Sequence, residues 1–415
     1  MLKRLRQIWR DRNANVMMVS AIGASAMVGA AGMGVDTVQW YLWNRQLQQA
    51  VDSGALAGAY GLHNGTDVTN VATGEIDRNF VDSFSVVRIV SPPQEGDYAG
   101  DTSAVEVVAT TSRKLPFSSL FLDAAPTIRV RSVAATVAGG KHCVIALAEN
   151  GTGIYVHGSA NVQLGCGAAA NSTVASAVDL TGSSLLNADP ISAVGGIEYA
   201  ERNIPSGTTL VPYGLPVQDP LASRNLDVPT SPAGCSQNNY TVQPNRTETI
   251  YPGRYCNGLA LKGDVTMAPG VYIIDRGDFD VSSQASVTGE GVTIILTGTT
   301  ASNIAEIKIN GGAELDLRAP TKLENPDWYN ILFFQDPRGT DVENIINGGS
   351  DLNFEGIVYF PSGDVRFNGN AGQHASCLLL VAQRVNFSGT SSLDNDCSSD
   401  YDDVATRSRI IRVVE

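Results

Sequence analysis

Hydrophobic positions divide the chain into a helical first part and a strand-rich remainder. Residues 13–35 carry no charge over 23 positions, and at about 1.5 Å per residue a helix of that length can cross a hydrocarbon core roughly 30 Å thick. Apolar positions then continue at helical spacing through residues 36–62, which predicts that the same helix extends as an amphipathic stalk. We therefore expect a membrane-spanning helix at 13–35.

The flanking charges predict the orientation of this helix. Residues 1–12 contain five basic side chains and one acidic one, and the next charge is Asp36. By the positive-inside rule, 1–12 is a cytoplasmic basic lead and the remainder lies outside the cytoplasm, with Trp40 and Trp43 near the membrane surface. A cleaved signal peptide is the alternative. The apolar run is long for one, and no small-residue cleavage site ends the helical pattern, so we favour retention.

A period-two pattern follows the helix. Residues 84–90, 103–115 and 127–139 are rich in β-branched side chains, which predicts three strands. The stretch Leu115–Asp123, LPFSSLFLD, separates the last two strands, and we expect it to form a single helical turn. Residues 36–140 are thus predicted to be a helix with a small antiparallel sheet.

Residues 141–415 show a different pattern, with short apolar runs separated by Gly, Asn, Ser or Asp. Many short strands predict either a sandwich or a β-solenoid. We favour a parallel β-helix, because runs such as ELDLRAP and DVRFNGN place a strand directly before a corner residue, although no strict repeat can be counted. Residues 205–254 hold eight of the eighteen prolines and predict a long excursion, either a surface loop or part of a binding face.

The six cysteines form three successive pairs with separations of 23, 21 and 20 positions, all on the predicted outer side. An even count in an oxidising compartment indicates disulfides rather than a metal site. Local loop closure costs the least entropy and favours sequential pairing among the possible connectivities. The predicted pairs are Cys143 with Cys166, Cys235 with Cys256 and Cys377 with Cys397.

The first sixty residues resemble the TadE/TadG-like Flp pilus-assembly proteins, most closely the larger TadG type. The resemblance is carried by the basic lead, the small-residue apolar run and a set of matching positions in the following helix: Asp36, Leu47, Gln48, Ala50, Asp52, Ala55, Leu56, Ala57, Gly58 and Ala59. Leu115, Pro116 and Phe117 also stand where that family has a Leu-Pro-Phe segment before the last strand. The resemblance implies a pilin-like module and a non-catalytic role in pilus assembly.

Charge limits the partners. The chain carries a net charge of −14, and since residues 1–12 contribute +4, the rest carries −18. An acidic outer part argues against nucleic acid as a partner. The apolar run implies the lipid bilayer as a partner, and the family resemblance implies pilins or pseudopilins, or Tad secretion-system membrane proteins. Ala26, Ala30 and Gly34 recur every four positions and predict a helix–helix interface in the membrane.

Candidate chemistry is sparse. Asp275, Asp278 and Asp280 are spaced closely enough to bind calcium, but solvated turn carboxylates are the favoured interpretation in an acidic protein. The sequence contains no Gly-x-Ser-x-Gly, P-loop or His-Glu-x-x-His motif, and we expect neither a cofactor nor enzyme activity.

These observations predict an α+β, mainly β fold in a single-pass inner-membrane protein with a periplasmic body. We expect an anchor or a minor, tip-like subunit of the Tad/Flp pilus. The familiar prepilin pattern of Gly followed by a Glu is absent, which argues against processing and extraction into the filament. The alternatives are a surface-displayed adhesin or glycan-binding module and, less favoured, a β-helix polysaccharide-degrading enzyme.

Overall fold

The computed structural model describes residues 12–224, 226, 234–340, 342–347, 351–368, 372–389, 392–395 and 406–415. The chain forms two compact units, one of residues 1–137 with 411–415 and the other of residues 138–410. The basic lead at residues 1–11 lies outside the described part.

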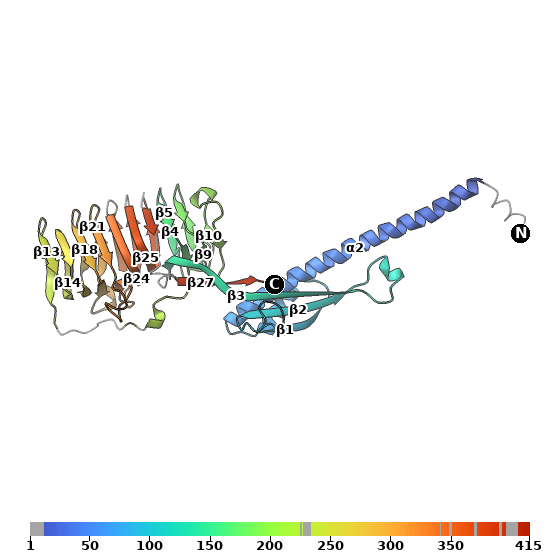
Figure 1. The fold of residues 1–415 in the computed structure, drawn as a ribbon, viewed down its shortest axis with the longest axis horizontal. Helices are drawn as coiled ribbons and strands as arrows, with labels where there is room; N and C mark the ends of the chain where they lie inside the picture. The colour runs from blue at the N-terminus through green and yellow to red at the C-terminus, as the bar shows by residue number, and fades with distance from the viewer. Residues whose placement is uncertain are drawn as a thin grey trace, which may run out of the picture. The chain divides into compact units, whose positions relative to one another are not determined.

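One unbroken helix, α2 (Arg12–His63), joins the predicted membrane span to the predicted stalk. Its two parts have opposite environments. Upstream, Met17 is 77% exposed and Val28 64% exposed, and the most apolar 18-residue window is only 6% buried. Downstream, Leu47, Val51 and Ala55 are fully buried. Figure 1 shows the upstream part extending beyond the strands that cover the downstream part. By length and composition α2 can cross a membrane.

The downstream part of α2 packs against a three-stranded antiparallel sheet. β1 (Ser85–Val90) pairs with β2 (Ala104–Ser112), and β2 pairs with the first part of β3 (Thr127–Ala146), with Ala104 opposite Ala135. These strands match the three predicted runs, and η1 (Ser118–Leu120) forms the predicted helical turn between β2 and β3. The core between helix and sheet contains Val105, Val107, Ala109, Ile128, Val130 and Ala134.

A second helix, α3 (Val68–Asn79), packs on α2 and was not predicted. The side chain of Asp67 caps it by accepting the Asn70 amide at 2.9 Å, and Ala72 and Ile76 form its buried stripe. An Asx cap followed by apolar residues four apart is the signal that could have revealed it. Contact is close because Gly54 of α2 lacks a side chain: a Cβ there would lie 2.6 Å from Cγ1 of Ile76.

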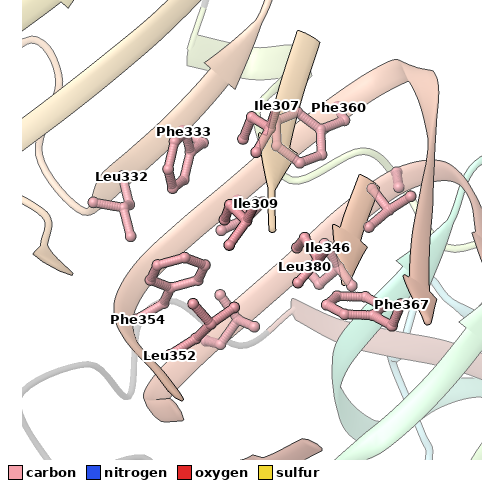
Figure 2. Packing of buried hydrophobic residues seen from close by; sticks show 14 of the residues in the cluster. Ile307, Ile309, Leu332, Phe333, Ile346, Leu352, Phe354, Phe360, Phe367 and Leu380 are labelled. Atoms are coloured by element: carbon pink, nitrogen blue, oxygen red, sulfur yellow. The ribbon is translucent and has the colours of Figure 1, made fainter. Parts of the chain in front are cut away.

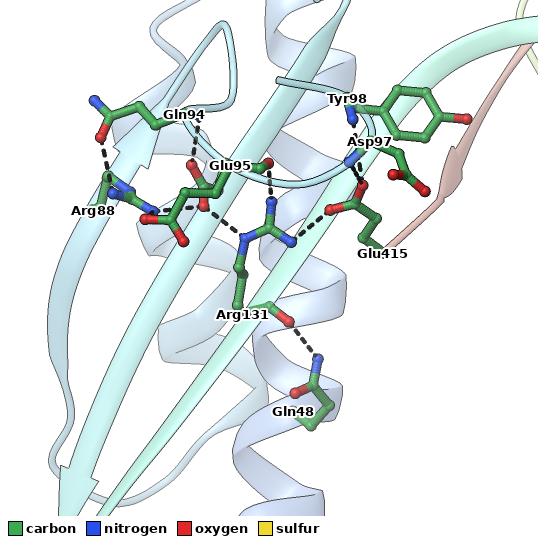
Figure 3. Close-up of polar contacts among 9 residues, drawn as sticks. Gln48, Arg88, Gln94, Glu95, Asp97, Tyr98, Arg131 and Glu415 are labelled. Carbon is green, nitrogen blue, oxygen red and sulfur yellow. Dashed lines mark hydrogen bonds and ion pairs between the residues drawn. The ribbon is translucent and has the colours of Figure 1, made fainter. Parts of the chain in front are cut away.

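A buried carboxylate fixes the register of the sheet. Glu106 on β2 is fully buried. Its carboxylate accepts hydrogen bonds from the side chains of Arg88 and Arg131, each at 2.7 Å, and from the backbone amide of Gln94 at 3.0 Å. Arg131 also pairs with Glu415 at 2.6 Å (Figure 3). Burial alone would raise the pKa of Glu106, but these hydrogen bonds outweigh it and hold the pKa below its ordinary value of 4.5.

The second unit is built from three ladders, and all of the pairings among its described strands are parallel. Strands are stacked along each ladder, as Figure 1 shows, and each lies one coil of the chain from the next except where β25 and β26 pair with β3, β4 and β5. The first ladder runs through β12 (Gln237–Val242), β14 (Gly253–Leu261), β16 (Gly270–Asp275), β19 (Val292–Thr297), β22 (Ile331–Gln335), β24 (Asp351–Asn368), β25 (Gly372–Phe387), the end of β3, β6 (Gly167–Ala170), β9 (Ile191–Ala193) and β11 (Leu210–Val211).

The other two ladders share strands with the first, because long strands turn corners: β14 lies in the first two ladders, and β24 and β25 lie in all three. The second runs through β14, β17 (Asp278–Val281), β20 (Glu306–Ile309), β23 (Val342–Asn347), β24, β25, β4 (Ile154–Val156), β7 (Val178–Leu180) and β10 (Ile197–Glu198). The third runs through β13 (Thr247–Ile250), β15 (Asp264–Met267), β18 (Ser286–Glu290), β21 (Glu314–Arg318), β24, β25, β26 (Ser392–Asn395), β5 (Asn161–Leu164) and β8 (Leu185–Asn187). The remaining elements are η2 (Glu201–Asn203), η3 (Ala222–Arg224), η4 (Ala301–Asn303) and β27 (Thr406–Val413).

The order of the ladders explains the Pro-rich excursion. The chain enters the stack in the middle at β3 and coils to one end at β11. It restarts at the opposite end at β12 and coils back until β25 pairs with β3. The connecting segment crosses successive coils: Val217 bonds Asn171 at 2.8 Å, Asp219 bonds Tyr359 at 2.6 Å and Arg224 bonds the Tyr329 carbonyl at 3.0 Å.

This segment has a structural role that its composition did not reveal. Val217 and Leu221 are buried in an apolar cluster with residues of β19, β22, β24 and β25. The excursion is shorter than the predicted 205–254, since β12 and β13 lie inside that range. Residues 225 and 227–233 lie outside the described part.

The interior of the stack is apolar and aromatic. Phe333 is fully buried. The centroid of its ring lies 5.6 Å from the ring centroid of Phe354, 5.9 Å from that of Phe279 and 6.3 Å from that of Phe360. Figure 2 shows Phe333 and Phe354 with Ile309 and Leu352 in the same layer of packing. Aromatic side chains from neighbouring coils thus hold the ladders together.

We expect Phe333→Ala to lower the free energy of unfolding of this unit by about 3–5 kcal/mol, because it leaves a cavity among rings that cannot collapse. Leu323→Ala is the control, since Leu323 is 99% exposed and its loss should cost less than about 0.5 kcal/mol. A urea titration of the full-length protein, read by pulsed hydrogen exchange of β19 and β22, measures both. Equal effects of the two substitutions would contradict the packing described here.

Glu106 predicts a pH dependence in the first unit. Because its pKa is lower in the folded protein, its stabilising effect is present above the unfolded pKa of about 4.5 and is lost as the pH falls through the folded value. Glu106→Gln should destabilise β2 and β3 by about 2 kcal/mol at neutral pH and reduce their acid sensitivity. The same urea titration, read by hydrogen exchange of β2 and β3 and repeated at several pH values, measures this. Glu95→Gln, at a side chain 67% exposed, should retain the wild-type profile, and an unchanged profile in Glu106→Gln would refute the assignment.

Candidate functional site

Asp36 is a buried position near the end of the bare part of α2. Val38 and Tyr41 after it are still 59% and 57% exposed, and full burial begins at Leu47. The carboxylate of Asp36 is only 3% exposed and accepts the backbone amide of Phe117 at 3.1 Å and both the amide and the hydroxyl of Ser118. These donors belong to the turn around η1 in the connection between β2 and β3. One carboxylate therefore ties this connection to the helix, 81 positions away in sequence.

The ionised form of Asp36 suits this role. Burial by itself would raise its pKa, but the hydrogen bonds from Ser118 and from the two backbone amides lower the pKa overall. A charged acceptor makes stronger hydrogen bonds than a neutral one. The charge that follows the apolar run thus holds the connection between β2 and β3 on the helix. This is in addition to the role in orientation that the sequence predicts.

Gly32 provides the space for this contact. A Cβ at Gly32 would lie 2.6 Å from Cδ1 of Phe117, so the ring of Phe117 packs directly on the helix backbone. Gly32 and Asp36 are four positions apart and share a face of α2. We call residues 115–122 the apolar loop. Gly32 makes room for the ring of Phe117, and Asp36 accepts the backbone amides of Phe117 and Ser118.

The apolar loop and the bare helix enclose a groove of about 820 Å³. Its walls are apolar: Ala24, Ser25, Val28, Gly29 and Met33 of α2 on one side, and Phe117, Ser118, Leu120, Phe121 and Leu122 of the loop on the other. The predicted helix–helix residues Ala26, Ala30 and Gly34 lie on the exposed part of α2, and their role stays a prediction.

The positions from Leu47 to Ala59 that carry the family resemblance lie in the stalk part of α2 and pack on the sheet. Leu47, Ala50, Ala55 and Ala59 belong to one core cluster with β2 and β3. Gln48 donates to Asp52 at 2.7 Å and to the carbonyl of Arg131 at 3.1 Å, and Figure 3 shows this second bond. These residues therefore dock the helix on the sheet.

Among the described residues of the second unit, two disulfides are present. Cys143 is bonded to Cys166 and Cys235 to Cys256, the pairs that local closure favours. The first ties the end of β3 to the residue before β6, and the second ties the chain before β12 to β14. Each staples neighbouring coils of the first ladder. The third predicted pair includes Cys397, which lies outside the described residues.

Asp275, Asp278 and Asp280 each have a protein partner. Asp275 is buried with Arg254 at 2.8 Å, Asp278 pairs with Lys308 at 2.8 Å, and Asp280 accepts the Asn310 amide at 3.0 Å. Among the described residues no group of three potential ligands gathers that could hold a metal ion. The structure therefore uses these carboxylates to join neighbouring coils, and they do not converge on one point.

We expect Asp36→Asn to release the apolar loop. An amide side chain offers one uncharged acceptor, so the amides of Phe117 and Ser118 should exchange at least about tenfold faster with deuterium. Asp123→Asn makes the same change at an exposed position close to the loop and should leave exchange unaltered. Hydrogen-exchange mass spectrometry of the full-length protein measures both, and unchanged protection in Asp36→Asn would contradict the fastening role.

Comparison with known proteins finds a family match, and it lies on α2. Residues 14–61 match the family model of the putative Flp pilus-assembly TadE/G-like proteins, and the matched segment spans both the bare and the packed part of the helix. No curated protein and no solved structure matches the chain. The helix that carries Gly32 and Asp36 is therefore similar to a TadE/G-like Flp pilus-assembly domain over residues 14–61.

Proposed function

We propose that the protein is a non-catalytic, membrane-anchored component of the Tad/Flp pilus assembly apparatus, of the TadG type. The observation that carries this is the coincidence of the matched segment with a helix of two environments. Its upstream part is apolar and bare, and its downstream part is packed on protein, with full burial beginning at Leu47. A bare apolar surface of this length is costly in water and favourable in lipid.

The orientation follows from charge. The five basic residues of the lead precede the span, and the acidic remainder follows it, so the N-terminus lies in the cytoplasm and the sheet and β body lie outside. The two disulfides support this placement, since disulfides persist in oxidising compartments. In a double-membrane envelope the anchor lies in the inner membrane and the body in the periplasm.

The first unit serves as a pilin-like module. A long helix whose outer half packs on a small sheet can lie beside the helices of pilins or pseudopilins, and the Ala26, Ala30 and Gly34 face allows close approach in the membrane. The sequence lacks the Gly–Glu processing pattern, which favours a retained anchor over a filament subunit.

The second unit serves as a rigid β-solenoid body. Stacked parallel ladders with an aromatic interior resist deformation and present an extended outer surface. Charged residues on that surface pair between neighbouring strands, as Lys308 does with Asp278 at 2.8 Å and Arg366 with Glu343 at 2.5 Å. This pattern suits a structural or docking surface.

A charge placed in the span tests the proposal. Val28→Arg puts a cation at an exposed site of the bare helix, where insertion costs about 2.5–3.5 kcal/mol more, and it should lower both the carbonate-resistant membrane fraction and the number of assembled pili. Val81→Arg makes the same change at a fully exposed position in the link between α3 and β1 and should alter neither. Normal membrane retention with Val28→Arg would refute the anchor, and normal piliation of a deletion strain would refute the assembly role.

A further inference from the structure

The apolar loop exposes three consecutive large side chains. Leu120 is 75% exposed, Phe121 87% and Leu122 52%. The nearest charges in sequence are Lys114 before the loop and Asp123 after it. Isolated exposed apolar residues are ordinary, but a contiguous apolar patch on a well-packed unit marks a contact surface.

The loop lies beside the bare part of α2. The helix residues that share the groove with it run from Ala24 to Met33, which is about 14 Å along the helix axis. All of them belong to the uncharged stretch at 13–35. Phe117 over Gly32 and the amides on Asp36 hold the loop at this level. If α2 crosses the bilayer along this stretch, the loop reaches the same depth as these helix residues.

The backbone of the loop is prepared for a water-free environment. The amides of Phe117 and Ser118 bond Asp36. The next four amides, from Ser119 to Leu122, bond carbonyls within the loop itself at 2.8–3.2 Å. Each amide from 117 to 122 therefore has a partner inside the protein, and Pro116 has no N–H to satisfy. A loop in water does not need this, but backbone amides exposed to lipid do.

We propose that the apolar loop is a second membrane contact, in which Leu120, Phe121 and Leu122 insert among lipid acyl chains of the outer leaflet beside α2. This inference rests on the proposed anchoring of α2 and adds to it. The first unit then holds the bilayer at two places, so that the depth and rotation of the helix are both fixed. The groove between loop and helix is filled by acyl chains.

Lipid fits this surface better than a neighbouring protein helix does. The apolar side chains of the loop continue the bare surface of α2 without an intervening charge. The amide pairing that suits hydrocarbon extends through the whole turn. Polar partners begin at the outer side of this surface, where Arg113 lies 4.6 Å from the ring centroid of Trp43, as expected of an interfacial aromatic residue.

Site-directed fluorescence in vesicles tests this proposal. The full-length chain, oxidised so that its native disulfides are intact, carries a single added cysteine labelled with a polarity-sensitive dye. The positions are Phe121→Cys in the loop, Val28→Cys in the helix and Val81→Cys as an exposed control in the same unit. Each is reconstituted in phosphatidylcholine vesicles and treated with acyl-brominated lipid or with aqueous iodide, and unlabelled wild-type protein gives the background.

We expect the dye at 121 to match the dye at 28, with blue-shifted emission, quenching by brominated lipid and protection from iodide, while the dye at 81 shows the reverse. Iodide quenching at 121 together with lipid quenching at 28 would overturn the loop insertion and leave the anchor intact. Iodide quenching at both positions would overturn the anchor itself. Protection at 121 from both quenchers would indicate a protein contact, such as a second copy, and would overturn lipid as the occupant.

Discussion

The carboxylate of Asp36 joins two segments that are 81 positions apart in sequence and that both expose apolar side chains. An aspartate at the end of a 23-residue uncharged run is costly unless its charge is satisfied, and here two amides and a hydroxyl satisfy it. Because the donors come from the apolar loop, solvating the charge also positions the loop. Gly32, one helical turn upstream, makes room for Phe117 and completes the contact. This arrangement holds the apolar loop against the exposed part of α2.

The second unit satisfies a different constraint. Parallel ladders leave unpaired edges at both ends of a stack, and chains with such edges tend to associate. At one end of the first ladder the edge is short, since β11 is only two residues long. The chain enters in the middle and closes the stack by pairing β25 with β3, so that neither end of the second unit's chain segment forms a free edge. The crossing segment around Val217 and Leu221 then covers an apolar side of the stack.

Local features of the fold could be read from the sequence, while non-local ones could not. The long helix, the three strands of the first unit and the pairs Cys143–Cys166 and Cys235–Cys256 follow from periodicity, β-branched runs and short loop closure. The α3 helix was missed because its apolar stripe is only two residues, Ala72 and Ile76, and its cap was overlooked. The sharing of Glu106 between Arg88 and Arg131 depends on strand register, which a charged residue in the run AVEVV hints at without specifying.

The candidate site shows the same limit. Asp36 stands out as the first charge after the apolar run, and the Leu-Pro-Phe segment stands out as a local turn, but nothing in the chain between them says that they meet. The order of coils is also invisible, since a stack entered in the middle and one entered at an end have the same short strands and corners. Proline density marked the crossing segment correctly as unusual, and only the contacts of Val217, Asp219 and Arg224 gave its role.

The mass and location of the mature protein distinguish a retained membrane anchor from a processed pilus subunit. Intact-mass analysis of inner-membrane and sheared-pilus fractions, with and without a thiol alkylator, reports processing, placement and free thiols together. For a retained anchor with its disulfides intact, we expect a full-length species in the inner membrane with Cys143, Cys166, Cys235 and Cys256 unalkylated. A shortened species in the sheared filaments would contradict the anchor and identify a pilus subunit instead.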